Sequence, residues 1–331
     1  MTMFSCPPWQ RELALCDKFL SMDERNFHCW DYRHLVAARA GRENSAELEF
    51  TRDKINDNFS NYSAWHFRSK LLSVEHPSHD QSQHTLQETV HHEELELVQN
   101  AAFTDPDDSS AWFYHTWLLG HQSSDAAQLL FIKKRDSSIT VSSTRPVSLS
   151  QLQVSGAGVE WSVSSARVRS VWSGQLRSGG QLQVSLGQET LEMTVDDGDK
   201  HILGDAFKNI NFHPAPSEAT KKVLLEELEN VDQLLELEPD SKWPCYTRTM
   251  IMMYLDSEGY FSEILEAFDK LKQVDHMRRG YYDDMKSKFV IEHSLEKHAL
   301  SSSFDVLDLS EYKVTKLFHK QYLEIFKEVK W

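Results

Sequence analysis

The chain has 331 residues, of which 40% are hydrophobic and 26% charged, an ordinary composition for a protein with two or three structural units. Its net charge of −16 argues against nucleic acid or an anionic membrane as the main partner, because phosphate groups bind to positive patches. No apolar run approaches the ~20 residues of a membrane span. The four cysteines lack Cys-x-x-Cys spacing, which favours free thiols in a reducing compartment such as the cytoplasm.

A short box occurs three times near the start of the chain. Each copy has Asn or Asp four residues before a tryptophan and Arg or His three residues after it. The copies are Asn26–Trp30–Arg33, Asn61–Trp65–Arg68 and Asp108–Trp112–His115. Asn or Asp ahead of an apolar run is a typical helix N-cap. We therefore expect the tryptophans in the core of each unit, and the Arg or His either stacked on the indole or in contact with a neighbouring repeat.

Apolar residues at heptad spacing precede each box, which predicts a second helix in every unit. The sequence thus indicates a mainly α fold, a solenoid of helical hairpins that occupies residues 9–124 and continues over residues 215–300. In the second segment, Trp243 is interpreted as the tryptophan of a fourth copy. This copy is degenerate, because Trp243 lies four residues after Pro239, whereas Trp112 lies six residues after Pro106. A further hairpin without a box is expected over Phe261 to Val274 and Met277 to Leu300.

The helical pattern stops between the two segments. Residues 128–205 are rich in Ser, Gly, Val and Gln, with short runs that alternate apolar and polar residues. About six antiparallel strands are expected, which favours an inserted immunoglobulin-like β-sandwich. A disordered Ser-rich linker is the alternative, and the run Thr190 to Val195 is also compatible with a helix.

The last segment, residues 303–331, differs again. Phe304 to Leu317 matches the opening of a leucine-rich repeat, and the pattern breaks down after His319. A single incomplete repeat cannot bury its apolar face alone, so we expect the tail to be poorly ordered or packed on the last helices.

Few residues suggest chemistry on this chain alone. There is no phosphate-binding loop and no nucleophile elbow. The run His91-His92-Glu93-Glu94 could suggest a metal site, but adjacent helical residues point about 100° apart, so a solvated face is the preferred interpretation. His76, His79 and His84 lie in a predicted loop. His28, between cap and tryptophan, is a candidate for facing a partner or a groove, but from the pattern alone a partly exposed structural histidine is the preferred interpretation.

With the boxes in view, the chain resembles the α subunits of protein prenyltransferases, whose repeats carry Pro-x-Asn-Tyr-x-x-Trp-x-x-Arg. Asn61-Tyr62-Ser-Ala-Trp65-His-Phe-Arg68 is close to that motif, and the copy at Asn26 has Phe in place of Tyr. The inserted β segment and the leucine-rich tail narrow the resemblance to the α subunits of animal Rab geranylgeranyltransferases. Relative to them the chain looks truncated at both ends, and the lysine box of the preceding repeat is not in it.

The resemblance implies an α subunit that is inactive alone and supports a β subunit carrying the catalytic zinc. The heterodimer would transfer geranylgeranyl to C-terminal cysteines of Rab GTPases presented by the Rab escort protein. Asn26, His28, Asn61 and Tyr62 would contact substrate or the β subunit, while no catalytic residue, metal or cofactor is expected on this chain. The alternative is a non-enzymatic helical-repeat scaffold that binds another protein.

Overall fold

The computed structural model describes residues 8–331 except 79–85, 120–125, 163–166, 197 and 300–303. The chain forms two compact units. The first comprises the chain up to Ser123 together with Pro214–Ala267, and the second comprises Ser124–His213 and Phe268–Trp331. The helix α10 (Phe261–Val274) begins in the first unit and ends in the second.

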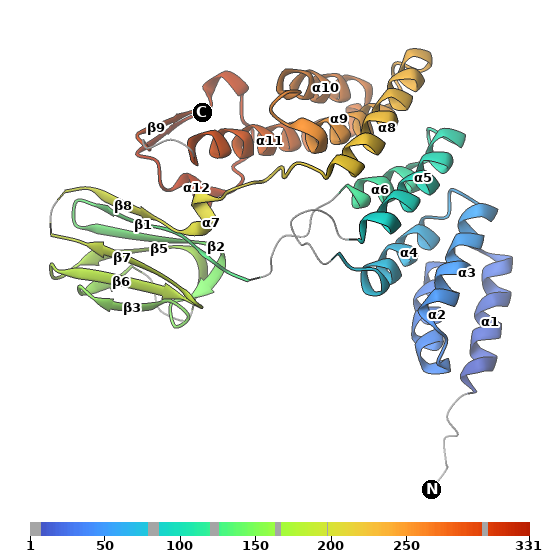
Figure 1. Ribbon diagram of the computed structural model, residues 1–331, viewed down its shortest axis with the longest axis horizontal. Coiled ribbons are helices and arrows are strands. Elements are labelled where there is room, and N and C mark those ends of the chain that lie inside the picture. Colours follow the sequence, from blue (N-terminus) through green and yellow to red (C-terminus); the bar gives the residue numbers. More distant parts are fainter. Residues whose placement is uncertain (1–7, 79–85, 120–125, 163–166, 197, 300–303) are drawn as a thin grey trace, which may run out of the picture. The chain divides into compact units, whose positions relative to one another are not determined.

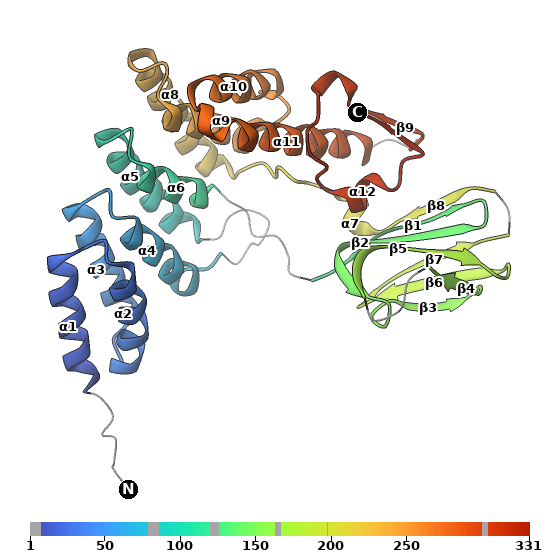
Figure 2. The same ribbon diagram turned by 180° about the vertical axis from the view of Figure 1, so that it is seen from behind.

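The first unit is built from antiparallel helical hairpins, which Figures 1 and 2 show side by side for α1 to α6. The hairpins are α1 (Trp9–Met22) with α2 (Phe27–Ala40), α3 (Asn44–Asp57) with α4 (Tyr62–Glu75), α5 (Glu88–Thr104) with α6 (Ser109–Leu118), and α8 (Glu218–Leu237) with α9 (Lys242–Asp256). The predicted caps are confirmed: the side chains of Asn26, Asn61 and Asp108 accept hydrogen bonds from first-turn amides of α2, α4 and α6. Gly41 ends α2 with φ +69°, a left-handed conformation that glycine adopts without steric cost.

The second unit contains a β-sandwich, with eight strands among the described residues. They are β1 (Leu129–Arg135), β2 (Ser138–Ser148), β3 (Gln153–Gly156), β4 (Val159–Trp161), β5 (Val168–Leu176), β6 (Gln181–Leu186), β7 (Glu189–Thr194) and β8 (Lys200–Leu203). One sheet has the order β4-β5-β2-β1-β8 and the other β3-β6-β7, and both are antiparallel. Residues from both sheets share one apolar core, which includes Ile132 and Val141 from the first and Leu182 and Val184 from the second.

The run Thr190 to Val195, whose sequence is also compatible with a helix, lies in strand β7 as far as Thr194. It pairs with β6 from Leu186↔Glu189 to Gln181↔Thr194, and its buried residues alternate with exposed ones. A two-residue turn with Gly187 at φ +61° joins the two strands, a conformation that suits a tight hairpin. Pairing with β6 therefore makes this run a strand, although its local propensity is compatible with either a strand or a helix.

The rest of the second unit is helical, with a small parallel strand pair. It contains α7 (Asp205–Lys208), the end of α10, the 3-10 turn η1 (His276–Arg278), α11 (Arg279–Ala299), β9 (Val306–Asp308), η2 (Ser310–Tyr312), α12 (Lys320–Leu323) and β10 (Glu328–Lys330). Strand β9 pairs in parallel with β10, with Val306 opposite Glu328. This offset of 22 residues lies in the range of one leucine-rich repeat.

The tail packs on the sandwich as well as on α11. Phe207 contacts the rings of Phe131, Phe304 and Tyr322, and Figures 1 and 2 both place α12 beside α7. His319 lies 2.7 Å from Glu292 of α11. The apolar face that one repeat cannot bury alone is thus covered by the insert.

These observations confirm a mainly α fold of helical hairpins with a β-sandwich inserted in the sequence. The division into four separate segments stays a prediction, because the second compact unit joins the sandwich, the end of α10, α11 and the tail.

Candidate functional site at the hairpin tips

Each box tryptophan fixes the loop at the tip of its hairpin. The indole nitrogens of Trp30, Trp65 and Trp112 donate to the carbonyls six residues earlier, at Glu24 (2.8 Å), Phe59 (2.8 Å) and Pro106 (3.0 Å). The three indoles are at most 2% exposed. A buried indole needs a partner for its N–H, and the loop carbonyl supplies it, so packing and loop geometry are set together.

The basic residue of each box joins its hairpin to the next one. Arg33 donates two hydrogen bonds to Glu47, both 2.9 Å, and Arg68 donates two to Glu94, at 2.7 and 2.6 Å. These fork-like pairs are buried and charge-assisted. Of the two roles considered from the sequence, contact with the neighbouring repeat therefore holds for both arginines.

His115 makes the corresponding joint in the third copy. Its Nε2 lies 2.6 Å from a carboxylate oxygen of Glu227 on α8, 112 residues further along the chain. The sandwich is inserted in the sequence between these partners, yet the joint links the same two positions of successive repeats, here through a single contact. Glu47 and Glu94 each stand 18 residues before the next box tryptophan, so this spacing is the sequence signal for the partner of the box arginine.

The fourth hairpin has a different register from the one predicted. Cys245, and not Trp243, occupies the box tryptophan position, because its thiol donates to the carbonyl of Pro239 six residues earlier. Ser241 then holds the cap position, and Arg248 holds the box arginine position and bonds Asp232 at 2.5 Å. The identity of the large aromatic misled the sequence interpretation, since a thiol makes the equivalent contact here.

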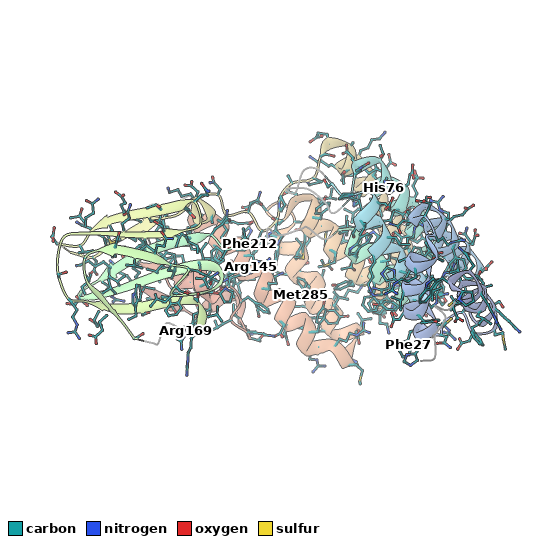
Figure 3. All side chains as sticks on the ribbon, turned by 90° about the horizontal axis from the view of Figure 1, so that it is seen from below. Phe27, His76, Arg145, Arg169, Phe212 and Met285 are labelled. Atoms are coloured by element: carbon teal, nitrogen blue, oxygen red, sulfur yellow. The ribbon has the colours of Figure 1, made fainter. Side chains whose placement is uncertain are left out.

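The tips also carry large aromatic side chains that are open to solvent. Phe27 is 60% exposed, Tyr62 53% and Phe113 46%. Tyr62 contacts the ring of Phe113 at 6.3 Å, and Phe113 contacts Trp243 at 5.2 Å. We call Tyr62, Phe113 and Trp243 the aromatic row; it runs across three hairpins of the first unit. Phe27 points away from the ribbon in Figure 3.

The four residues expected to contact substrate or a β subunit fall into two groups. Asn26 and Asn61 are caps, and Asn61 is fully buried, with its amide also donating to the carbonyl of Glu24. His28 and Tyr62 are exposed at the tips, His28 against the ring of Phe27 and Tyr62 stacked on His66. Burial and the nearby Lys70 lower the pKa of His66, which keeps this ring neutral at pH 7.

The run at His91 is not the solvated face that the sequence suggested. His91 is buried and lies 2.9 Å from the carbonyl of Leu118, and Glu94 is buried on Arg68. Among the described residues no group of three or more His, Cys, Asp or Glu is placed to hold a metal ion. His79 and His84 lie outside the described residues. No described helix is long and apolar enough to cross a membrane.

Comparison with known proteins agrees with this geometry. A family model described as protein prenyltransferase alpha subunit repeat matches residues 9–40, 44–74 and 91–122, which correspond to the first three hairpins. The chain is 41% identical over 339 residues to geranylgeranyl transferase type-2 subunit alpha of Bos taurus and to that of Homo sapiens. Each comparison covers 95% of this chain and 58% of the relative. The Schizosaccharomyces pombe protein of the same name is 44% identical over 122 residues, 35% of this chain and 36% of that relative.

The repeats, their joints and these similarities define the class. The chain belongs to the protein prenyltransferase α-subunit family. Over nearly its whole length it is similar to the type-2 geranylgeranyl transferase α subunits of animals, and it spans about 58% of the length of the two animal relatives given above.

Proposed function

We propose that this chain is the α subunit of a protein geranylgeranyltransferase and binds a β subunit through its hairpin tips. The observation that carries the proposal is the similarity to type-2 α subunits over 95% of the chain. The exposed aromatic residues at the tips support it, because aromatic side chains are enriched at the energetically important positions of protein interfaces.

In this proposal the reacting groups lie mainly on the partner. The β subunit would hold a zinc ion, which would lower the pKa of a substrate thiol. The thiolate would then form a bond to C1 of geranylgeranyl diphosphate as the C1–O bond breaks and diphosphate leaves. The acceptors would be C-terminal cysteines of Rab GTPases presented by the Rab escort protein. The net charge of −16 fits a chain that supports a diphosphate site without forming it.

This chain's own contribution would be positional. Phe27, Tyr62 and Phe113 would supply apolar contact area, and His28 would reach substrate or the β subunit from the first tip. Asn26 and Asn61 would act indirectly, by holding the helix starts from which these side chains project.

Co-expression with a prenyltransferase β subunit tests the proposal. We expect a stable complex that transfers geranylgeranyl to a Rab substrate when escort protein is present. Replacing Tyr62 and Phe113 together by Ala should weaken the complex at least roughly tenfold, because truncated aromatic anchors commonly cost 2 kcal/mol or more. Val74→Ala is the matched control, since Val74 is 70% exposed at the other end of α4.

The outcomes separate the two candidate functions. Folded protein that forms no complex with the β subunit would favour the non-enzymatic scaffold. A complex that forms equally well with the double variant would remove the aromatic row from the interface. For His28→Ala, a raised KM with the complex intact would indicate a substrate contact, whereas weakened assembly would indicate a β-subunit contact.

A further inference from the structure

A cationic cavity lies in the second unit. It has a volume of about 360 Å³ and is formed by β1, β8 and the tail. Five of the residues that line it are cationic: Lys133, Lys134, Arg135, Lys200 and Lys327. Asp199 and Asp305 are the two carboxylates in the lining, so the wall is positive although the whole chain carries −16.

The strand register brings Lys133, Arg135 and His201 to one face of the sheet, whereas Lys134 and Lys200 lie on the other face. Lys133 on β1 stands directly opposite His201 on β8, and Lys134 stands opposite Lys200. Alternate residues of a strand share a face, so Lys133 and Arg135 project from the same side of β1. The tail adds Lys327, and Phe304 packs its ring against His201 at 5.1 Å.

Both carboxylates already have partners. Asp305 pairs with Lys327 at 2.6 Å, and Asp199 accepts the backbone N–H of Asp136 at 2.9 Å. The ammonium group of Lys133 is held by two neutral acceptors, the carbonyls of Glu324 (2.8 Å) and Phe326 (3.0 Å). Arg135 is exposed, and its guanidinium has no hydrogen-bond or ion-pair partner among the residues that the structure describes. The two carboxylates therefore offset only part of the positive charge of this wall.

We propose that this cavity is a binding site for a small phosphate-bearing anion, either a free phosphate compound or a lipid headgroup. Arg135 and Lys327 would bind the phosphate oxygens, and Lys133 and His201 would form the floor. Phosphate oxygens accept several charge-assisted hydrogen bonds at once, which suits a guanidinium beside ammonium groups.

The electrostatics of the site agree with an anionic occupant. Burial and the nearby Arg135 lower the pKa of Lys133. Partial burial, Lys133 and Lys327 lower the pKa of His201. Like charges are thus held close enough to disfavour one another, and a bound dianion would relieve that repulsion.

The shape of the site favours a small ligand over an acidic peptide. About 360 Å³ is at the lower end of small-molecule sites, whereas a peptide needs an extended groove or a free sheet edge. Phe304 and Ile325 also line the cavity, and these apolar side chains would contact the carbon skeleton of a phosphate ester.

Calorimetric titration of the full chain at constant ionic strength tests the proposal with two probes, inorganic diphosphate and inositol trisphosphate. We expect one saturable site. The variant with Arg135→Gln and Lys327→Gln should lose at least roughly tenfold in affinity, since each lost hydrogen bond to a charged group is worth 1.5 kcal/mol or more. Lys330→Gln is the matched control, because Lys330 is exposed on β10 outside the cavity, and its affinity should stay unchanged.

Vesicles distinguish the two sources of phosphate. Binding to phosphatidylinositol bisphosphate vesicles far above phosphatidylcholine vesicles would identify a lipid headgroup, and tight binding of the free probes alone would identify a soluble compound. Three results would overturn the proposal: no saturable binding of any phosphate probe, equal affinity in the double variant, or binding of a polyglutamate peptide only. The circular dichroism spectrum of the double variant shows whether it is folded; His201→Glu supplies an independent charge reversal with the same expected loss.

Discussion

At the scale of single residues, the buried ion pairs between hairpins carry a large desolvation cost, which only their mutual contacts offset. Arg68 and Glu94 are both almost fully buried, and Glu94 also accepts from the hydroxyl of Tyr114 at 2.6 Å. Burial and this carboxylate raise the pKa of Tyr114 well above its usual range, so the phenol stays protonated as a donor. Each group offsets the cost of burying the others, so removal of one partner leaves an uncompensated charge.

We expect Glu94→Gln to destabilise the protein by about 3–5 kcal/mol, because it leaves the Arg68 guanidinium buried without a counter-charge. The double variant Arg68→Met, Glu94→Leu should recover a substantial part of that loss. Chemical denaturation of Arg68→Met, of Glu94→Leu and of the double variant measures the coupling, which should exceed about 1 kcal/mol.

The exposed pair Lys54–Asp57 provides the control, since its aspartate is 62% exposed and such pairs contribute about 0.2–1 kcal/mol. Equal coupling in the two pairs, or additive single substitutions at Arg68 and Glu94, would contradict the role given to the buried joint.

At the scale of elements, α11 is tied to the segment that follows the sandwich. Glu296 accepts the backbone N–H groups of Phe212 and His213, and its carboxylate also faces the ring of His213 at 3.5 Å. Burial opposes ionisation of Glu296, but the hydrogen bond and charge of His213, with the two backbone N–H groups, lower its pKa below 4.5. Glu292 faces the same histidine at 3.6 Å.

This shift makes the stability of the second unit depend on pH. A carboxyl group whose folded-state pKa is lowered stabilises the fold above its unfolded pKa, and that stability is lost as pH falls through the folded value. We expect Glu296→Gln to cost about 1.5–3 kcal/mol near pH 7. The difference between wild type and variant should shrink as pH falls from 4.5 downward, as measured by thermal unfolding across pH. A constant difference over that range would show that ionised Glu296 is not the stabilising species.

The joints between hairpins also explain why an insertion is tolerated. His115 and Glu227 occupy the same repeat positions as Arg33 and Glu47, although the sandwich lies between them in the sequence. A solenoid repeat contacts only its neighbours, so a segment can enter at one loop provided that the following hairpin still meets the preceding one.

At the scale of the whole molecule, the second unit has a core to which distant parts of the sequence contribute. The rings of Phe131, Phe207, Phe304 and Tyr322 meet there, and Ser142 of β2 donates to the carbonyl of Gln321 at 2.7 Å. The tail is therefore ordered by surfaces that belong to the insert.

We expect replacement of residues 128–205 by a short flexible linker to unfold the tail while leaving hairpins α1–α6 folded. Hydrogen exchange provides the measurement: the amide of Leu309, which donates to Lys330 at 2.7 Å, should lose its protection. The amides of α4 serve as the internal control and should keep theirs. Retained protection at Leu309 would mean that α11 alone is enough to order the tail.

Much of the helical architecture could be predicted from the sequence, because its causes are local. Caps at Asn26, Asn61 and Asp108 and the apolar periodicity lie within a few residues of the hydrogen bonds that they determine. The exposed tips were partly foreseen through His28 and Tyr62, but Phe113 was missed because an aromatic inside an apolar run looks like core. Asn61 is a buried cap that also donates to the carbonyl of Glu24, and its contact with substrate or a β subunit stays a prediction.

The sequence by itself determined the hairpins, their caps, the positions of three indoles and the presence of a strand-rich insert. Only the tertiary structure decided that Cys245 takes the place of the fourth indole, that His115 meets Glu227, and that the insert covers the tail. It also decided that cations from β1, β8 and the last residues share one cavity. The physical reason is the range of the interactions: helix periodicity and capping act within one or two turns, whereas burial and ion pairing depend on which surfaces meet after the chain has folded.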